Sequence, residues 1–176
     1  PLMRGVRVTE DGVLVADVPT PEPGLDDVVV KVAAAGICGS DLHIRDDIPE
    51  VPVGMPMGHE GVGVIEAVGE GVTRFKRGDR VVSCCLQSCG ACEECVTLEP
   101  AVCSTFGAPM NLLFGCQGEA FLVGGADNTL ARVPDGMPDR IAIFTADVMS
   151  TGFGAIERAG VRAGQSVAIF AQGPVG

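Results

Sequence analysis

The sequence predicts a mainly β fold, a barrel or sandwich of short strands, with a helical region near its C-terminal end. Short valine-rich runs alternate with turns of Gly, Pro and Asp, which is the pattern of small all-β domains. Twenty-five of the 176 residues are glycine, in keeping with many tight turns. The spacing of apolar residues changes to a helical period near residue 147.

The first strands are expected within residues 6–18, around a turn at Asp11 and Gly12, because Asp-Gly favours the tight turn of a hairpin. A rigid polar turn, TPEPG, follows this hairpin. The later runs consist of β-branched or small apolar residues bounded by glycine or polar residues. They predict strands over residues 27–35, 61–68 and 79–83.

A helix is expected over residues 150–160, with Ser150 or Thr151 as the N-cap and Gly160 as the stop. The apolar residues at helical spacing are Phe153, Ile156 and Ala159. Residues 165–170 (QSVAIF) predict a buried strand that leads directly into a glycine-rich turn, AQGPVG.

The composition excludes several classes of partner. Hydrophobic residues make up 47% and charged residues 20%, as in an ordinary globular protein, and the formal net charge is −11. Without a basic stretch, binding to nucleic acid or to an anionic membrane is not expected. There is no apolar run long enough to span a bilayer and no secretory signal at the start, so a cytoplasmic location is expected.

Half of the eight cysteines form a cluster, CGACEECVTLEPAVC, with the spacing C-x2-C-x2-C-x7-C. Disulfides are the alternative, but near neighbours rarely satisfy disulfide geometry. Four thiolates around a tetrahedral ion form the usual structural zinc site, and Gly90 eases the tight turn. We predict that this zinc stabilises a lobe with too little apolar content to fold alone. The expected ligands are Cys89, Cys92, Cys95 and Cys103, whereas Cys84, Cys85 and Cys116 are expected to be partly buried apolar residues.

A second metal site is suggested by His59 beside Glu60, with Cys38 located 21 residues earlier at the end of an expected strand. Asp147 stands in an apolar stretch, where a charge is costly unless it is paired or bound to a metal. The residues alone leave alternatives open, because His59 and Glu60 could be a surface dipeptide and Asp147 a helix cap. Three protein ligands would leave one position open, as in catalytic zinc sites, and one thiolate, one carboxylate and Zn²⁺ sum to zero charge.

Six stretches together resemble the N-terminal, GroES-like catalytic domain of zinc-dependent medium-chain alcohol dehydrogenases. They are GICGSDLH, GHEGVGVIEAVGEGV, FKRGDRV, the four-cysteine cluster, DVMSTGF and AIFAQGPVG. The resemblance implies a GroES-like β-barrel over residues 1–147, with the zinc lobe at about 84–108. Residues 148–176 would be the first helix and strand of a Rossmann domain, and the chain would stop inside its phosphate-binding turn, since a full member is about twice as long.

The resemblance also implies roles for residues in GICGSDLH and around it. Cys38, His59 and Asp147 would be the catalytic zinc ligands; many members have cysteine in place of Asp147, and a bacterial branch has aspartate. Glu60 would lie beside the metal, as a neighbour of its ligands or a transient ligand. Ser40 would hydrogen-bond the substrate oxygen, and His43 would pass its proton outward. Asp41 is expected to be structural, as a helix cap.

Cofactor contacts follow from the same resemblance. Thr151 and Val175 match positions that contact the nicotinamide of NAD or NADP. Gly173 and Gly176, with Pro174 between them, match the dinucleotide fingerprint G-x-G-x-x-G, in which backbone N–H groups approach the pyrophosphate. Ala171 replaces the first glycine, which is tolerable only if its φ stays below zero. Cys85 matches a position that lines the substrate pocket.

The implied function is the reversible oxidation of a small alcohol to an aldehyde or ketone, with two zinc ions per chain, in a dimer or tetramer when full length. A bound zinc would lower the pKa of the alcohol, as it lowers that of water to about 7, and the hydride would pass to the nicotinamide. Alternatives are a polyol, threonine or formaldehyde dehydrogenase of the same superfamily, or a non-catalytic zinc-binding module.

Overall fold

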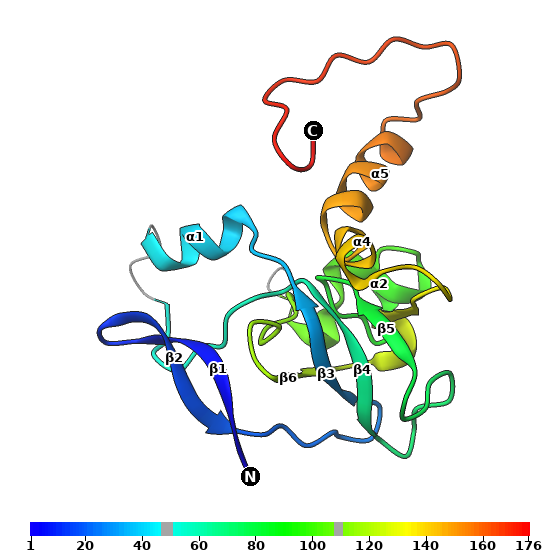
Figure 1. Cartoon of the computed structure of the whole chain (residues 1–176). Coiled ribbons are helices and arrows are strands. Elements are labelled where there is room, and N and C mark those ends of the chain that lie inside the picture. Colours follow the sequence, from blue (N-terminus) through cyan, green and yellow to red (C-terminus); the bar gives the residue numbers. More distant parts are fainter. Residues whose placement is uncertain (47–50, 108–110) are drawn as a thin grey trace.

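The computed structural model describes residues 1–46, 51–107 and 111–176, and it is mainly β (Figure 1). An antiparallel hairpin, β1 (Leu2–Thr9) and β2 (Gly12–Pro19), lies beside a five-stranded antiparallel sheet with the strand order β6-β3-β4-β5-β7. The strands of the larger sheet are β3 (Val28–Ala35), β4 (Gly61–Val68), β5 (Arg80–Ser83), β6 (Ala120–Val123) and β7 (Leu130–Arg132).

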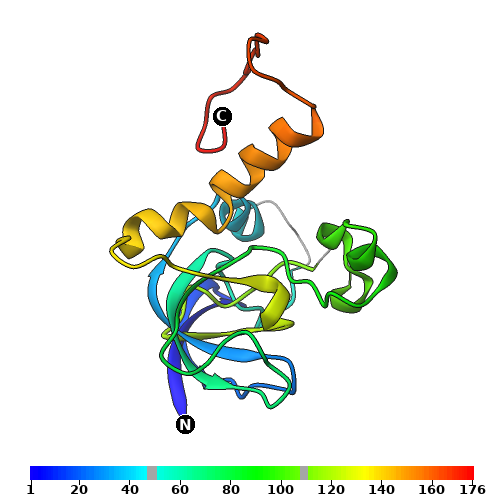
Figure 2. The ribbon, with the colours of Figure 1, turned by 90° about the vertical axis from the view of Figure 1, so that its right-hand side faces the viewer.

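All the strands expected in the first half of the chain are confirmed, with β1 and β2 longer than expected. The short edge strands β6 and β7 were not predicted, because runs of four and three residues carry little period-2 signal. The zinc-lobe segment contains α2 (Glu93–Val96) and two 3₁₀ turns, and projects from one side of the sheet (Figure 2). The expected end of this lobe, residue 108, lies outside the described residues.

Two buried clusters determine where the functional residues lie. The larger one joins β3, β4 and β6 through fully buried side chains, among them Val28, Val30, Ile65, Phe121 and Val123. A second cluster packs Ala142 and Ala146 against Val62 and Val82 of the sheet. It therefore fixes the short helix α4 (Asp139–Ala142) and the 3₁₀ turn Ile143–Thr145 close to the ends of β4 and β5.

The remaining helices are α1 (Gly39–Asp46), α3 (Ala126–Thr129) and α5 (Val148–Arg158). Helix α1, which was not predicted, follows directly from the end of β3, and α5 points away from the sheet (Figure 1). No helix in the described part of the chain is both long and apolar enough to cross a bilayer.

The helix predicted over 150–160 is confirmed, but it begins at Val148, so Asp147 and not Ser150 or Thr151 occupies the N-cap position. Gly160 has φ +63°, as expected of a residue that ends a helix. The apolar residues at helical spacing are not buried, since Phe153 is 66% and Ile156 41% exposed.

The strand predicted over residues 165–170 is not formed; the segment is exposed, and Phe170 retains 90% of its accessible surface. A strand needs a neighbour to satisfy its N–H and C=O groups, and none of the described strands pairs with this segment. The condition under which alanine is tolerable at position 171, a φ below zero, is not met. The φ of Ala171 is +59°, in the left-handed region, where it begins a tight turn closed by Gly173 N–H on its carbonyl at 2.7 Å.

Of the three cysteines that were assigned to neither metal site, Cys85 and Cys116 are buried, in agreement with their expected apolar role. Cys84 is exposed, contrary to expectation. The difference follows from the alternation of side chains along an extended segment, which places neighbouring residues on opposite faces.

Candidate functional site

The pairing of β3 with β4 brings Cys38 and His59 together although 21 residues separate them. Ala35, the last residue of β3, is paired with Gly61, the first residue of β4. The contact continues one step further, where Gly36 N–H donates to the carbonyl of Glu60 at 3.2 Å. Because antiparallel strands join the end of one to the start of the next, the residues just beyond both ends meet at one edge of the sheet.

Asp147 reaches the same place from a third segment. The backbone N–H of Cys85, just past β5, donates to the carbonyl of Ala146 at 3.1 Å. This bond fixes the chain immediately before Asp147, and the fully buried Ala146 anchors it from inside. The residue at the start of α5 is therefore positioned by the sheet, although α5 itself extends into solvent.

The distances between these side chains suit one metal ion. Sγ of Cys38 lies 3.8 Å from Oδ2 of Asp147, and Nε2 of His59 lies 3.5 Å from the same oxygen. With a carboxylate oxygen of Glu60, the ligand atoms all lie within 4.8 Å of one another. Bonds of about 2.0–2.3 Å to a tetrahedral zinc place ligand atoms roughly 3.4–3.8 Å apart. The donor set of sulfur, imidazole nitrogen and carboxylate oxygen is one that zinc accepts.

Charge gives an independent reason for a cation. His59 is 2% exposed, and Asp41 and Asp147 both form their ion pairs with this one imidazole. The ion pair with Asp147, followed by that with Asp41, raises the pKa of His59 to about 11 against the opposing effect of burial. The ion pair with His59 is also the main cause that lowers the pKa of Asp147 to about 2. One imidazolium cannot balance the buried carboxylates of Asp41 and Glu60 together with the half-buried one of Asp147, so a divalent ion suits the site.

Asp41 supports two of the ligand residues at once. Its Oδ2 accepts the backbone N–H of Cys38 at 2.9 Å, as a carboxylate at the third helical position accepts the N-cap N–H in a capping box. Its Oδ1 lies 3.4 Å from Nδ1 of His59. Burial raises the pKa of Asp41, but the bonds from His59 and Cys38 outweigh it and leave the pKa lowered. Metal-binding histidines commonly have a carboxylate behind the ring, which orients it.

The expected cap role of Asp41 is thus observed, but the contact with His59 was not predicted. The spacing Cys38-x-x-Asp41 indicates the cap, since it is local. Nothing local connects Asp41 to His59, which becomes its neighbour only through the pairing of β3 with β4.

Glu60 is 6% exposed, and burial, together with the charge of Asp147, raises its pKa. Its carboxylate lies directly against Gly36, where a Cβ would be 1.7 Å from Oε2. Only glycine at this position therefore leaves room for the carboxylate beside the cluster.

Ser40 and His43 both lie on α1 and are exposed. Ser40 Oγ is 3.7 Å from Sγ of Cys38. Residues three apart share a face of a helix, so the hydroxyl and the imidazole lie along one side of α1. Of the two groups, the Ser40 hydroxyl is the one in contact with a candidate metal ligand, Cys38.

A cavity of about 470 Å³ opens beside the cluster. Its lining includes Cys38, Glu60 and Asp147, and also Pro174 and Val175 from the C-terminal segment. These two residues, expected to contact a cofactor, are thus brought to the candidate site.

Gly173 and Gly176 do not line this cavity. The N–H of Gly176 donates to the carbonyl of Gly173 at 3.1 Å, so they close a turn on each other. Thr151 does not line this cavity either, but it contacts a candidate ligand directly, because its hydroxyl donates to Oδ1 of Asp147 at 2.6 Å. Cys85, expected at a substrate pocket, lines a separate groove along α5 with Thr151.

The four clustered cysteines form the second candidate metal centre. Their sulfur atoms all lie within 4.8 Å of one another, with Cys89 4.0 Å from Cys95 and Cys92 3.7 Å from Cys103. A tetrahedral ion with Zn–S bonds of about 2.3 Å separates its sulfurs by roughly 3.8 Å, whereas a disulfide requires about 2.05 Å. The geometry agrees with a bound ion and not with disulfides.

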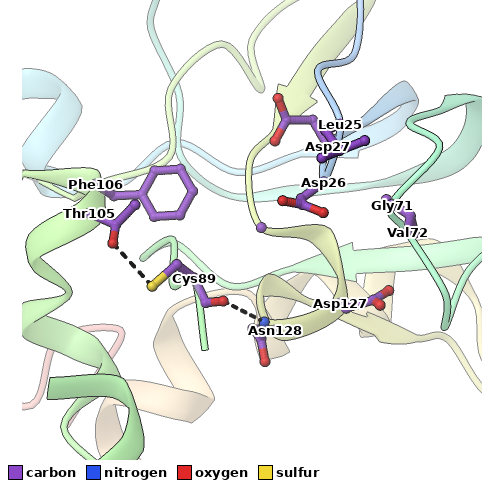
Figure 3. Close-up of a pocket in the computed structure, with 11 residues that line it drawn as sticks. Leu25, Asp26, Asp27, Gly71, Val72, Cys89, Thr105, Phe106, Asp127 and Asn128 are labelled. Carbon is purple, nitrogen blue, oxygen red and sulfur yellow. Dashed lines mark hydrogen bonds between the residues drawn. The ribbon is translucent and has the colours of Figure 1, made fainter. Parts of the chain in front are cut away.

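Cys89 is held at the boundary between this lobe and the sheet (Figure 3). Its Sγ accepts the hydroxyl of Thr105 at 3.2 Å, and its carbonyl accepts Nδ2 of Asn128 at 3.1 Å. The bond from Thr105 is the first cause that lowers the pKa of Cys89 to about 6, with the N–H of Ala91 next. A cavity of about 390 Å³ lies beside Cys89 and is lined in part by Asp127. The carboxylate of Asp127 accepts hydrogen bonds from the backbone N–H groups of residues 73 and 74.

Residues 24–135 match the family model described as alcohol dehydrogenase GroES-like domain. An alcohol dehydrogenase of Cupriavidus necator is 34% identical over 99% of this chain and 53% of its own length. An uncharacterised zinc-type alcohol dehydrogenase-like protein, AdhB, of Bacillus subtilis is 37% identical over 93% of this chain and 48% of its own length.

Among solved structures, the alcohol dehydrogenase TADH from Thermus sp. ATN1 superposes with a TM-score of 0.89 at 36% identity. The match covers 98% of this chain and 52% of that structure. The chain therefore spans about half the length of the relatives it matches.

Proposed function

The chain belongs to the family defined by the alcohol dehydrogenase GroES-like domain, and we propose that it carries the zinc centres of an oxidoreductase that interconverts alcohols with aldehydes or ketones. In this proposal NAD or NADP carries the hydride, and a small alcohol, aldehyde or ketone is the substrate. The chain holds two zinc ions. One is bound by Cys38, His59 and Asp147, which form the cluster of residue 38, and the other by the four-cysteine cluster.

One observation carries the proposal: Cys38, His59 and Asp147 converge from three segments at distances that suit one ion. A structural zinc is closed by four protein ligands, whereas a catalytic zinc keeps three protein ligands and an open position. The cavity of about 470 Å³ beside the cluster supplies room for a small substrate there.

Zinc, when bound, supplies a Lewis acid that favours loss of the alcohol proton and polarises the carbonyl in the reverse direction. Around it, Asp41 holds the ring of His59 and the backbone of Cys38 in place. Glu60 adds a buried carboxylate beside the ion.

Ser40 and His43 move the proton. The Ser40 hydroxyl, close to the sulfur of Cys38, accepts the proton of the substrate hydroxyl while it donates its own proton to the path that leads to His43. His43, one turn further along α1 and exposed, passes a proton to solvent.

A nicotinamide cofactor, when bound, accepts or donates the hydride. Its expected contacts are Thr151 and residues 173–176, of which Pro174 and Val175 line the cavity. Cys38 and Asp147 line the same cavity, so the cofactor ring and the substrate would meet beside the ligand residues.

The test is metal content combined with activity. The chain is expected to bind two zinc ions, and Asp147→Ala is expected to bind one. The full-length protein is expected to reduce NAD or NADP with a panel of alcohols, and Asp147→Ala to lose this activity while it stays folded. A single ion bound only by the four cysteines, with no activity, would instead indicate a non-catalytic zinc-binding module.

A further inference from the structure

The two oxygens of Asp41 have different partners. Oδ1 lies against Nδ1 of His59 at 3.4 Å, while Oδ2 accepts both the N–H of Cys38 at 2.9 Å and Nε2 of Gln117 at 3.1 Å. The carboxylate is 4% exposed, so protein groups replace nearly all its hydration. Gln117 therefore supplies one of the few donors that hold this carboxylate toward the ring.

Gln117 is itself fixed from two sides. Its N–H donates to the carbonyl of Met57 at 3.1 Å, and its carbonyl accepts the N–H of Val6 from the β1–β2 hairpin at 2.9 Å. Gly58 lies directly beneath it with φ +85°, and a Cβ there would be 2.5 Å from Cγ of Gln117. The glutamine is thus anchored to the residue next to His59, through a contact that only glycine permits.

The choice of an amide also suits the site. A neutral donor satisfies Oδ2 without cancelling the charge of Asp41, so the carboxylate keeps its attraction for His59. A lysine or arginine would pair with Asp41 and compete with the imidazole. The same Nε2 lies 3.4 Å from the carbonyl of Gly36, which links the end of β3 to this arrangement.

We propose that Gln117 is a positioning residue for the Cys38–His59–Asp147 site, acting through Asp41 on both the ring of His59 and the backbone of Cys38. The inference rests on the proposed function only in that this cluster binds a metal ion. It concerns the affinity and geometry of that site, so it is measured without turnover.

The test compares Gln117→Met with Gln87→Met in the chain as it is. Methionine has a similar length and shape but cannot donate a hydrogen bond. Gln87 is a matched control, because its side chain also links two segments, with Oε1 accepting Gly124 N–H at 2.8 Å and Nε2 donating to Leu112 O at 3.5 Å. Zinc affinity at each site is measured by chelator competition, and Co²⁺ in place of zinc reports the ligand geometry by its absorption spectrum.

Gln117→Met is expected to weaken binding at the cluster of residue 38 about tenfold and to shift its Co²⁺ spectrum, with the four-cysteine site unchanged. Gln87→Met is expected to leave the cluster of residue 38 unchanged. In an Asp41→Asn background the effect of Gln117→Met is expected to shrink below about threefold, because residues that act through a shared partner are not additive.

Three results would overturn the inference and leave the proposed function standing: equal zinc affinity in Gln117→Met and the unmodified chain, an equal loss of affinity at both metal sites, or full additivity of Gln117→Met with Asp41→Asn. If the unmodified chain binds only one zinc ion, both the inference and the proposed function are overturned. If Gln117→Met does not fold, Gln117→Ala takes its place, since it removes the amide donor without adding volume or charge; the same loss at one site is expected.

Discussion

Asp41 Oδ1 lies 3.4 Å from Nδ1 of His59, on the side of the imidazole opposite to the oxygen of Asp147. The ring is therefore held between two carboxylates. That of Asp41 orients the ring, and that of Asp147 is a candidate ligand of the same ion as His59. The same Asp41 closes the start of α1 through the N–H of Cys38. One short helix thus connects a local folding signal to the geometry of a site built from distant segments.

The approach of Glu60 to Gly36 predicts a strong effect of one methyl group. Gly36→Ala would place Cβ 1.7 Å from Oε2 of Glu60, so the carboxylate or the strand end must move. We expect the free energy of unfolding to fall by about 1–3 kcal/mol, as measured by denaturant titration. Gly39→Ala is the matched control, because nothing lies within 4 Å of its added Cβ, and it is expected to be neutral or slightly stabilising in α1. Equal effects of both substitutions would contradict the close contact.

The four-cysteine cluster is expected to stabilise the fold. Cys103 is fully buried with its sulfur 3.7 Å from that of Cys92, so Cys103→Ser removes one ligand from a closed site. Substitutions that remove a structural metal lower the free energy of unfolding by about 4 kcal/mol or more, which corresponds to a fall in Tm of roughly 10 °C in a chain of this size. Cys84→Ser, at an exposed thiol outside the cluster, is expected to keep Tm and metal content. An unchanged Tm in Cys103→Ser would show that the lobe folds without its ion.

The stability of the metal-free chain is expected to fall in alkali because of His59. The pKa of His59 is raised from 6.5 to about 11, first by Asp147 and then by Asp41. A raised pKa contributes stability that is fully present below 6.5 and is lost as the pH rises through about 11. The pKa of Asp147 is lowered from 3.8 to about 2, so its contribution is present above 3.8 and lost as the pH falls through about 2.

The measurement is the free energy of unfolding of chelator-treated chain at about pH 5, 7 and 9. The chain has two histidines, which provides the comparison: His59→Asn is expected to flatten the alkaline decline, and His43→Asn to leave it unchanged. Zinc displaces the proton of His59, so the zinc-loaded chain is expected to lose this decline and its zinc affinity to rise with pH. A decline that persists in His59→Asn would assign it to another group.

The hydroxyl of Thr151 is expected to support Asp147. It donates to Oδ1 at 2.6 Å and contributes, after the larger effect of His59, to the lowered pKa of this carboxylate. Thr151→Val is expected to weaken zinc at the cluster of residue 38 by about tenfold, while Thr151→Ser keeps the affinity. Ser150→Ala is the control, because that hydroxyl donates to the backbone carbonyl of Asp147 and not to the carboxylate. If Thr151→Val kept full affinity, cofactor contact would be its only remaining role.

Ser40 is expected to act in turnover and not in metal binding. In the full-length protein, Ser40→Ala is expected to lower kcat by about 10²-fold with both zinc ions retained, since a positioned proton-transfer group contributes about that much or more. Ser40→Thr keeps the hydroxyl and is expected to restore much of the rate. Steady-state kinetics across a range of pH, with metal analysis of each variant, tests this. Unchanged turnover in Ser40→Ala would remove the residue from the proton path.

Local patterns were sufficient for most of the sheet. Valine-rich runs bounded by glycine identified β3, β4 and β5, because burial of alternate side chains requires such residues. The four cysteines were identifiable for the same reason, since their spacing lies within one short segment. By contrast, residues 165–170 are apolar enough for a strand but lack a partner among the described strands, which no local pattern can reveal.

The site was less predictable where it depends on register. Cys38 and His59 are brought together by the pairing of Ala35 with Gly61, and a shift of that pairing by two residues would separate them. Asp41 was expected to be a cap, and its second contact, with His59, follows from the same register. Gln117 could not be selected from the sequence, because it lies 76 residues from the carboxylate it contacts.

The distribution of the three ligand residues along the chain has a topological consequence. Half of the polypeptide lies between His59 and Asp147, and the four-cysteine lobe lies within that half. An ion gripped by both residues would close this long loop as a crosslink does, and such closure restricts the unfolded ensemble more as the loop lengthens. Removal of the ion by a chelator would open this loop without breaking a covalent bond, and the first sites of proteolysis are then expected within the loop.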